Sequence, residues 1–258
     1  DGNSLVHRAY HALPPLTNKK GELVNAVYGF FSILFKAIKD WQPDCLVAAF
    51  DLHFPTFRHK EFSAYKTNRP KLGEDFYLQI PRVKEILSAM KIPVFEKEGF
   101  EADDLIGTIS REITADNSCN AEAIILSGDL DNLQLVNKKI KVLTPKKGLG
   151  EAVLYDENLV FQRYSGLTPS QLPDFKALKG DPSDNFPGVN GIGEKTAIKL
   201  IGEFGNIENL YRAVKEGKVF DGRLGEKLKD TQEIAFLSKR LATIDQFSPI
   251  NFSLSECW

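Results

Sequence analysis

Three carboxylates within four positions, Glu101, Asp103 and Asp104, are the residues of this sequence best suited to chemistry. An apolar pattern with helical spacing begins directly behind them, at Leu105 and Ile106. Acids in the first turn of a helix are stabilised by unpaired N–H groups and by the positive end of the helix dipole, so simple capping is one explanation. A cap does not need three acids, however. The cluster therefore favours a site for a hard divalent cation, Mg²⁺ or Mn²⁺, in which carboxylate oxygens replace water ligands.

Further carboxylates recur at the carboxyl ends of predicted strands, which a parallel sheet brings to one edge, and in one later Gly-rich segment. In chain order they are Asp1, Asp51, Asp129, Asp131, Asp181 and Asp184. Any single one of them could equally be a helix cap or a surface acid. Together with the first three they make nine, too many to gather in ionised form without bound cations. Two divalent ions roughly 4 Å apart would neutralise them and could clamp the attacking and leaving oxygens of a phosphodiester.

Basic and aromatic side chains interleave between residues 57 and 69. The candidates for nucleic-acid contact there are Arg58, Lys60, Tyr65, Lys66 and Arg69. Such interleaving suits a single-stranded nucleic acid, which needs both positive charge and stacking surfaces. A solvated loop whose long basic side chains cover apolar surface fits the composition equally well. The net charge of −2 excludes neither reading, because residues 53–72 contain five cationic residues and one acid.

A Gly-rich segment runs from Pro187 to Ala197 and includes the start of a predicted helix at 194–204. Glycines permit a tight turn and leave backbone N–H groups free at the start of that helix, where an anion such as a DNA phosphate can bind. An ordinary Gly-rich loop is the alternative, but the whole pattern is typical of a helix-hairpin-helix at about residues 181–204. The residues expected to contact DNA there are Gly188, Gly191, Gly193, Lys195, Thr196 and Lys199.

These residues need elements to position them, and the two halves of the chain predict different ones. Short apolar runs at 45–50, 92–95, 122–126, 141–143 and 152–155 predict strands, and residues 24–41 predict a helix. Beyond residue 156 the strand signal fades and helical patterns follow one another. We predict an α/β core at residues 1–165, with a mainly parallel central sheet, flanking helices and an arch region at 54–80. A helical DNA-binding region should follow at 166–258.

Composition sets the broad class of this 258-residue chain. Hydrophobic residues make up 42% and charged residues 26%, an ordinary soluble mixture, and no apolar run is long enough to cross a bilayer. The three cysteines, Cys45, Cys119 and Cys257, are odd in number and far apart in sequence. This pattern predicts a reduced, intracellular protein.

Five motifs together resemble the bacterial 5′-nuclease family. They are V-A-A-F-D ending at Asp51, Y-K-T-N-R ending at Arg69, G-F-E-A-D-D ending at Asp104, S-G-D-L-D ending at Asp131, and G-D-P-S-D-N-F-P-G-V-N-G-I-G-E-K-T-A from Gly180. That family comprises the N-terminal 5′→3′ exonuclease domain of DNA polymerase I, its free-standing relatives and the flap endonucleases. The resemblance covers essentially the whole chain, with the motifs in the right order.

The resemblance implies a PIN-like fold and a role for each candidate residue. Asp1, Asp51, Glu101 and Asp103 would surround one metal ion, with Asp104 in or near its coordination sphere. The second ion would lie among Asp129, Asp131, Asp181 and Asp184. Lys66 and Arg69 would stand at the base of a helical arch and contact the scissile phosphate, acting in catalysis together with Asp51 and Asp129. The hairpin would grip duplex DNA, with a K⁺ ion held by its carbonyls.

The implied activity is a structure-specific 5′→3′ exonuclease or flap endonuclease that hydrolyses DNA with two Mg²⁺ or Mn²⁺ ions. Its substrates would be flaps, nicks and 5′ ends, including RNA-primed ones, in DNA replication, Okazaki-fragment processing and repair. We expect a monomer of the bacterial cytoplasm or nucleoid, either fused to a DNA polymerase or free-standing.

Two other functions compete with this reading, and one feature departs from it. A DNA-binding module without catalysis would gain nothing from the complete acid set. A PIN-like ribonuclease would typically lack the helical region and the hairpin.

Family members also carry a short apolar strand before the first Asp, which is absent in front of Asp1. Unless residues precede it, we expect Asp1 to be poorly anchored.

Overall fold

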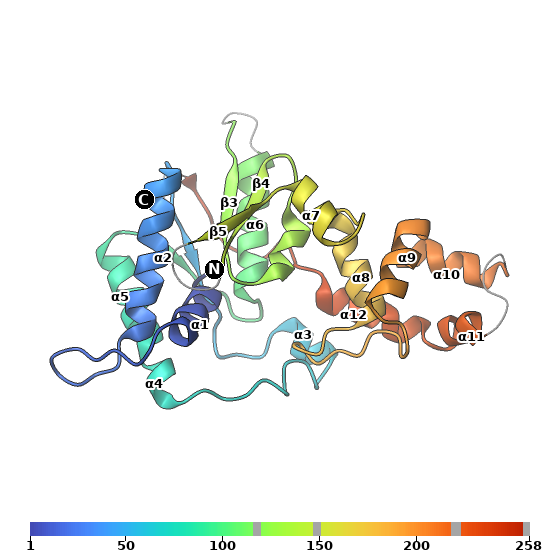
Figure 1. Cartoon of the computed structure of the whole chain (residues 1–258), viewed down its shortest axis with the longest axis horizontal. Coiled ribbons are helices and arrows are strands. Elements are labelled where there is room, and N and C mark those ends of the chain that lie inside the picture. Colours follow the sequence, from blue (N-terminus) through green and yellow to red (C-terminus); the bar gives the residue numbers. More distant parts are fainter. Residues whose placement is uncertain (116–119, 147–150, 218–222, 255–258) are drawn as a thin grey trace.

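The first part of the chain alternates helices and strands, as the sequence predicts (Figure 1). The computed structural model describes residues 1–115, 120–146, 151–217 and 223–254. The helices of this part are α1 (Gly2–Ala12), α2 (Asn25–Trp41), α3 (Phe57–Glu61), α4 (Glu74–Tyr77), α5 (Gln79–Ala89), α6 (Ala102–Ala115) and the 3₁₀ helix η1 (Leu130–Leu135). The strands are β1 (Ala48–Ala49), β2 (Val94–Phe95), β3 (Ala123–Leu126), β4 (Ile140–Pro145) and β5 (Ala152–Tyr155).

The described strands form two small sheets. Strand β1 pairs with β2 in parallel, Ala48 opposite Val94. Strand β3 pairs with β4 in parallel, and β4 pairs with β5 antiparallel. The predicted α/β core with parallel strands is therefore confirmed, although β1 is much shorter than the apolar run at 45–50 suggested.

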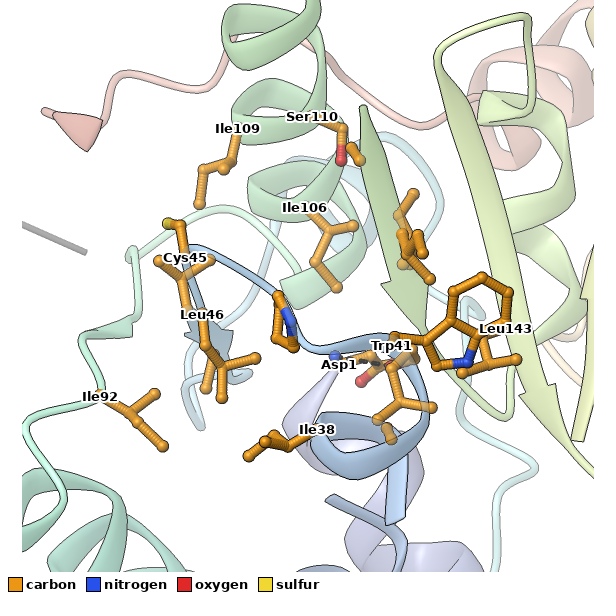
Figure 2. Close-up of a pocket in the computed structure, with 18 of the residues that line it drawn as sticks. Asp1, Ile38, Trp41, Cys45, Leu46, Ile92, Ile106, Ile109, Ser110 and Leu143 are labelled. Atoms are coloured by element: carbon orange, nitrogen blue, oxygen red, sulfur yellow. Dashed lines mark hydrogen bonds between the residues drawn. The ribbon is translucent and has the colours of Figure 1, made fainter. Parts of the chain in front are cut away.

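An apolar cavity of about 680 Å³ separates the two sheets (Figure 2). Strands β1 and β3 line it from opposite sides, and Ile38 and Trp41 of α2 and Ile106 and Ile109 of α6 line it further. The N-terminal end of α1 bridges the carboxyl ends of both strands beside this cavity. The Asp1 nitrogen donates to the Leu126 carbonyl at 3.0 Å, and Asn3 Oδ1 accepts from the Asp51 N–H at 3.2 Å. The ends of β1 and β3 are thus held next to each other, which places the acids that follow them at one edge.

The second part of the chain is helical, as predicted. It consists of α7 (Glu157–Arg163), the 3₁₀ helix η2 (Pro169–Gln171), α8 (Leu172–Lys179), α9 (Glu194–Phe204), α10 (Ile207–Lys215), α11 (Arg223–Asp230) and α12 (Gln232–Ala242). Leu178, Leu200 and Leu210 are buried in its own core, contributed by α8, α9 and α10. Helices α9, α10 and α11 extend away from the sheets in Figure 1. This part therefore has a hydrophobic centre of its own.

The chain after α12 returns to the sheets. Ile244 packs with Ile125 of β3 and Leu133 of η1, and Arg111 of α6 donates to the Gln246 carbonyl at 2.7 Å. These contacts fix the helical part against the α/β part.

No helix within the described residues is long and apolar enough to span a membrane. Cys45 is disulfide-bonded, so the prediction of reduced cysteines is wrong for this residue.

Candidate metal centre and nucleic-acid interface

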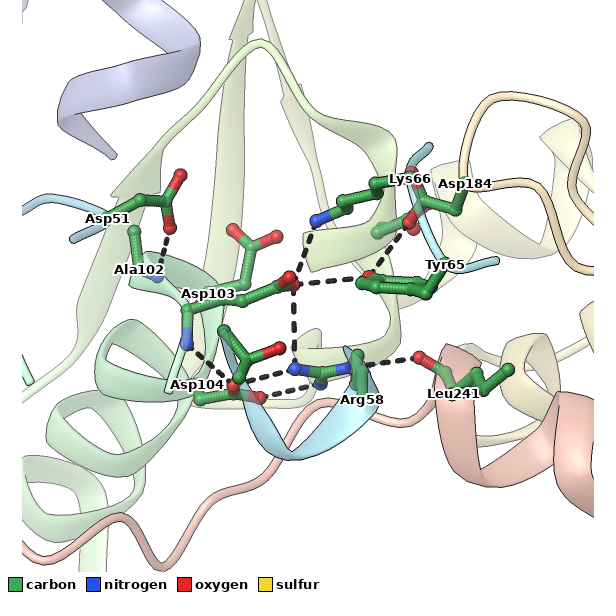
Figure 3. Close-up of polar contacts among 12 residues, drawn as sticks. Asp51, Arg58, Tyr65, Lys66, Ala102, Asp103, Asp104, Asp184 and Leu241 are labelled. Carbon is green, nitrogen blue, oxygen red and sulfur yellow. Dashed lines mark hydrogen bonds and ion pairs between the residues drawn. The ribbon is translucent and has the colours of Figure 1, made fainter. Parts of the chain in front are cut away.

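Asp51 and the start of α6 meet directly. Asp51 follows β1, and its Oδ1 accepts from the Ala102 N–H at 2.7 Å, so the carboxylate caps the helix that carries the acidic cluster (Figure 3). Glu101 and Asp103 flank Ala102 and are thereby brought to the end of β1. The sequence prediction that strand-end acids gather at one edge holds for these residues.

Asp1 is firmly held, contrary to the expectation from the sequence. Its Oδ1 accepts from the Ser4 N–H at 3.0 Å, as an N-cap of α1, and its Oδ2 accepts from the Ser127 hydroxyl at 2.6 Å. Ser127 follows β3 and also accepts from the Asp129 N–H at 2.9 Å. The carboxylate of Asp1 is therefore oriented by the strand that delivers Asp129.

Asp103 shares a crowded, electronegative environment with Asp129. Burial and then the nearby Asp129 carboxylate raise the pKa of Asp103 well above its ordinary value, while Asn132 donates to its Oδ1 at 2.8 Å. Asn132 is fully buried in η1 and orients Asp103, a role that no local sequence pattern indicated. A bound cation would remove the cost of ionising Asp103 in this environment, so its carboxylate is suited to a metal site.

Asp131, Asp181 and Asp184 form one compact group. A carboxylate oxygen from each lies within 4.8 Å of those of the other two. Asp131 comes from η1, and the other two come from the turn after α8, which Ser183 orders by donating from its N–H to Asp181 Oδ1 at 2.8 Å. Three of the four residues predicted for a second metal ion thus converge. Hard oxygen donors at this spacing fit Mg²⁺ or Mn²⁺.

Lys176 of α8 lies against this group and was missed by the sequence analysis. Its Nζ donates to Asp131 and, at 2.6 Å, to Asp181 Oδ2. Burial raises the pKa of Asp131 to about 6 even though Lys176 acts in the opposite direction. Burial opposes the charge on Lys176, but the two carboxylates outweigh it and raise the pKa of Lys176, which keeps it charged. The sequence offers one signal for Lys176: it lies five residues before Asp181, in the same helix-to-turn segment.

Tyr65 joins the two acidic groups rather than facing solvent (Figure 3). Its hydroxyl lies 3.2 Å from Glu101 Oε2 and 3.1 Å from Asp184 Oδ2, and the residue is 2% exposed. The prediction that Tyr65 stacks on DNA is therefore wrong in this structure, because its ring is covered. Its buried hydroxyl instead fixes the separation between Glu101 and Asp184.

Arg58 and Asp104 must also be reassigned. Arg58 is 2% exposed and donates through Nη1 and Nη2 to both oxygens of Asp104, which is 0% exposed. Asp104 further accepts from the backbone N–H groups of Glu101 at 3.0 Å and Asp245 at 2.8 Å. Arg58 therefore cannot reach DNA, and the cation that neutralises Asp104 is a guanidinium and not a metal ion.

Lys66 and Arg69 lie beside the acids, and their contact with a scissile phosphate stays a prediction. Lys66 Nζ donates to Glu101 Oε2 at 2.9 Å, and Arg69 pairs with Asp184. Burial opposes the ionisation of Glu101, but Lys66 and Arg58 outweigh it and hold the pKa of Glu101 below its ordinary value. Lys66 has a φ of 55°, an uncommon conformation for a residue with a side chain.

The backbone around Lys66 is tied to the turn after α8. The Lys66 N–H donates to the Asp184 carbonyl at 2.9 Å, and Asn185 donates to the Ala64 carbonyl at 2.7 Å. The foot of the region predicted as an arch is thereby docked onto the turn that carries Asp181 and Asp184. Lys60, at the other end of that foot, is exposed.

The Gly-rich hairpin presents an exposed face at the start of α9. Gly193 is the N-cap of α9, and it is exposed together with Lys195 and Lys199. A Cβ on Gly193 would have no neighbour within 4 Å, whereas one on Gly188, at φ 62°, would meet the Gly180 backbone at 2.2 Å. Gly188 therefore has no room for a side chain, and Gly193 leaves an open surface. DNA contact by these residues and by Gly191 and Thr196 stays a prediction.

The comparisons with known proteins cover the whole chain. A family described as "5′-3′ exonuclease, N-terminal resolvase-like domain" matches residues 1–165, and one described as "5′-3′ exonuclease, C-terminal SAM fold" matches residues 167–258. DNA polymerase I of Bacillus subtilis (strain 168) is 44% identical over 255 residues, 99% of this chain and 28% of that protein. DNA polymerase I of Bacillus caldotenax is 42% identical over 260 residues, again 99% of this chain and 28% of the relative. The chain therefore spans little more than a quarter of these relatives.

Solved structures share the fold. The T5 D15 protein co-crystallised with metal ions superposes with a TM-score of 0.77 at 20% identity, covering 95% of this chain and 88% of that one. The catalytic core of Rad2 in complex with DNA substrate gives a TM-score of 0.57 at 20% identity, covering 94% and 76%. At these identities the likeness concerns the architecture and not the individual residues.

Proposed function

This chain belongs to the 5′-3′ exonuclease family, and from that premise we propose that it hydrolyses DNA phosphodiester bonds at flaps, nicks and 5′ ends, leaving a 5′-phosphate. The observation that carries the proposal is the convergence of acids from separate parts of the chain with two basic residues. Asp51, Asp103 and Asp129 come from the α/β part, Asp181 and Asp184 from the helical part. Lys66 and Arg69 reach the same place.

Two divalent cations would be held by these residues. One would lie among Asp131, Asp181 and Asp184, with Asp129 beside them, and the other among Asp1, Asp51, Asp103 and Glu101. When bound, such ions acidify a water molecule for in-line attack and stabilise the leaving 3′ oxygen. Mg²⁺ is the ion we expect, and we assign a K⁺ ion to the hairpin carbonyls.

The chain's own groups would act on the phosphate and on the duplex. Lys66 and Arg69 would turn from Glu101 and Asp184 to the non-bridging oxygens and offset the charge that builds there. Tyr65 would hold Glu101 and Asp184 at a fixed separation throughout. Gly193, Lys195 and Lys199 would bind a backbone phosphate of the duplex arm at the N-terminus of α9.

The relatives support a proposal for the biological setting. DNA polymerase I matches almost the full length of this chain, so we place the nuclease in replication and repair, with removal of RNA primers from Okazaki fragments as one task. We propose that it works as a monomer in the bacterial cytoplasm, joined to a polymerase.

The test uses three 5′-labelled DNA substrates, a flap, a nicked duplex and a blunt duplex, each with Mg²⁺ and with EDTA. We expect metal-dependent cleavage of flap and nicked DNA and none in EDTA. Binding without cleavage in every arm would favour a non-catalytic DNA-binding module. A single-stranded RNA is added as a control, and its cleavage in place of the three DNA substrates would favour a PIN-like ribonuclease.

A further inference from the structure

Lys176 lies among the acids, and the proposed chemistry gives it no role. Its ammonium group contacts both Asp131 and Asp181, two members of the compact group of three. The third member, Asp184, pairs with Arg69. In this structure, therefore, each acid of the group already has a positive partner supplied by the protein.

The two partners differ in how free they are to leave. The side chain of Arg69 is 49% exposed and belongs to the irregular chain between α3 and α4, so it can turn towards a phosphate. Lys176 is 19% exposed, and its helix α8 is packed through Phe175, Ala177 and Leu178 into the core of the helical part. The backbone of Lys176 is fixed, and its charge stays within reach of the acids.

We propose that Lys176 is a resident counter-cation of the Asp131, Asp181 and Asp184 group, which stabilises these acids without metal and weakens their affinity for a divalent ion. The inference rests on the proposed function, because it assumes that this group binds such an ion. An incoming cation must either displace the ammonium group, breaking two charge-assisted hydrogen bonds, or bind beside a like charge. Both routes lower the affinity for the divalent ion.

The measurement is Mn²⁺ binding to the whole chain without DNA, followed by calorimetry and by the electron paramagnetic resonance signal of free Mn²⁺. Lys176→Met removes the charge and keeps much of the side-chain volume. We expect it to tighten binding at this group by at least about tenfold, given the strength of charge interactions at such distances. In EDTA the same variant should melt at a lower temperature than wild type. Addition of Mn²⁺ should raise the melting temperature of the variant by more than it raises that of wild type.

Further variants make the test specific. Lys179→Met removes the same charge from the same helix, but its partner is the exposed Glu194, so Mn²⁺ affinity should not change. Lys176→Arg keeps the charge and should bind Mn²⁺ close to wild type. Lys176→Gln should show the same gain as Lys176→Met and serves in its place if that protein does not fold. In an Asp181→Asn background the gain should be smaller, because Lys176 then neutralises only Asp131 of its two partners.

Unchanged or weaker Mn²⁺ binding in folded Lys176→Met or Lys176→Gln overturns the inference, and so does an equal gain in Lys179→Met. Failure of the proposed function has a different signature. If Asp131→Asn and Asp181→Asn each bind Mn²⁺ like wild type, the group is not a metal site at all. If these two variants lose affinity while removal of the Lys176 charge changes nothing, only the role of Lys176 is refuted.

Discussion

Arg58 and Asp104 form a two-bonded ion pair inside the protein, with both N–O distances at 2.7 Å and side chains 3% and 0% exposed. The pair joins α3 to α6, and Arg58 also donates to the carbonyls of Leu241 and Thr243 at the end of α12. Three segments far apart in sequence are thus fastened behind the acidic site. A buried charge that loses its partner is strongly destabilising.

The first prediction concerns this pair. Asp104→Asn should lower the free energy of unfolding by about 3 kcal/mol, because it leaves Arg58 buried without a full counter-charge. Guanidinium chloride titration measures the change. Arg240→Met, which removes the exposed pair with Glu61, is the control and should cost less than about 1 kcal/mol. Equal, small losses in both variants would show that Arg58 and Asp104 do not anchor the fold.

The second prediction concerns Lys66. Its interaction with the phosphate strengthens as charge develops, so Lys66→Met should slow single-turnover cleavage by about a hundredfold and change DNA affinity much less. Quenched-flow cleavage and binding in Ca²⁺ separate the two quantities. Lys60→Met, on an exposed residue of α3, should affect affinity only. An unchanged rate with weakened binding in Lys66→Met would make Lys66 a general phosphate contact.

The third prediction concerns the acids that follow β3. Exchange of Asp129 and Asp131 together for Asn should abolish cleavage, because amides are much poorer ligands for Mg²⁺ than carboxylates. Duplex binding in Ca²⁺ should persist, since the hairpin at α9 lies elsewhere. Asn preserves the hydrogen bond that Asp129 Oδ1 accepts from the residue 131 N–H, which limits structural damage. Near wild-type cleavage by this double variant would disprove the site.

The fourth prediction separates two glycines of the hairpin. The Cβ of Gly193→Ala would have no neighbour within the protein, so this variant should fold normally. The same Cβ would obstruct the proposed phosphate contact, so the variant should bind substrates with a downstream duplex arm more weakly. If a phosphate contact is lost, the dependence of affinity on salt should also become shallower. Gly188→Ala should instead lower the melting temperature, because its Cβ would meet the Gly180 backbone. Equal affinity and salt slope in folded Gly193→Ala would mean that this surface does not bind DNA.

The fifth prediction concerns pH. Burial raises the pKa of Asp131 to about 6, and a divalent ion binds the deprotonated carboxylate. Affinity for Mn²⁺ should therefore be highest above pH 6 and fall as the pH decreases through that value, because binding then requires loss of a proton. Calorimetry in buffers of different ionisation enthalpy should detect that proton release. In Asp131→Asn this part of the pH dependence should disappear, and its persistence would assign the titration to another group.

Much of the architecture could be predicted from the sequence, because it depends on local patterns. The alternation of short apolar runs with helical periodicity gave the α/β part, and the loss of strand signal after residue 156 gave the helical part. The helix expected at 24–41 is α2, Asn25–Trp41. Acids at strand ends were expected to gather because parallel strands deliver their carboxyl ends to one edge.

The tertiary structure alone decided which charges are partners. Arg58 pairs with an acid 46 positions away and Lys176 with one 45 positions away, and Tyr65 reaches an acid 119 positions away. In the sequence, Arg58 and Lys66 are both cationic residues of one basic segment. In the fold, Arg58 is buried and holds three segments together, whereas Lys66 lies beside the acidic site. Such pairings depend on how elements pack and not on the spacing of residues within an element. For the same reason Asp104 looked like a metal ligand in sequence and is an interior counter-ion in the fold.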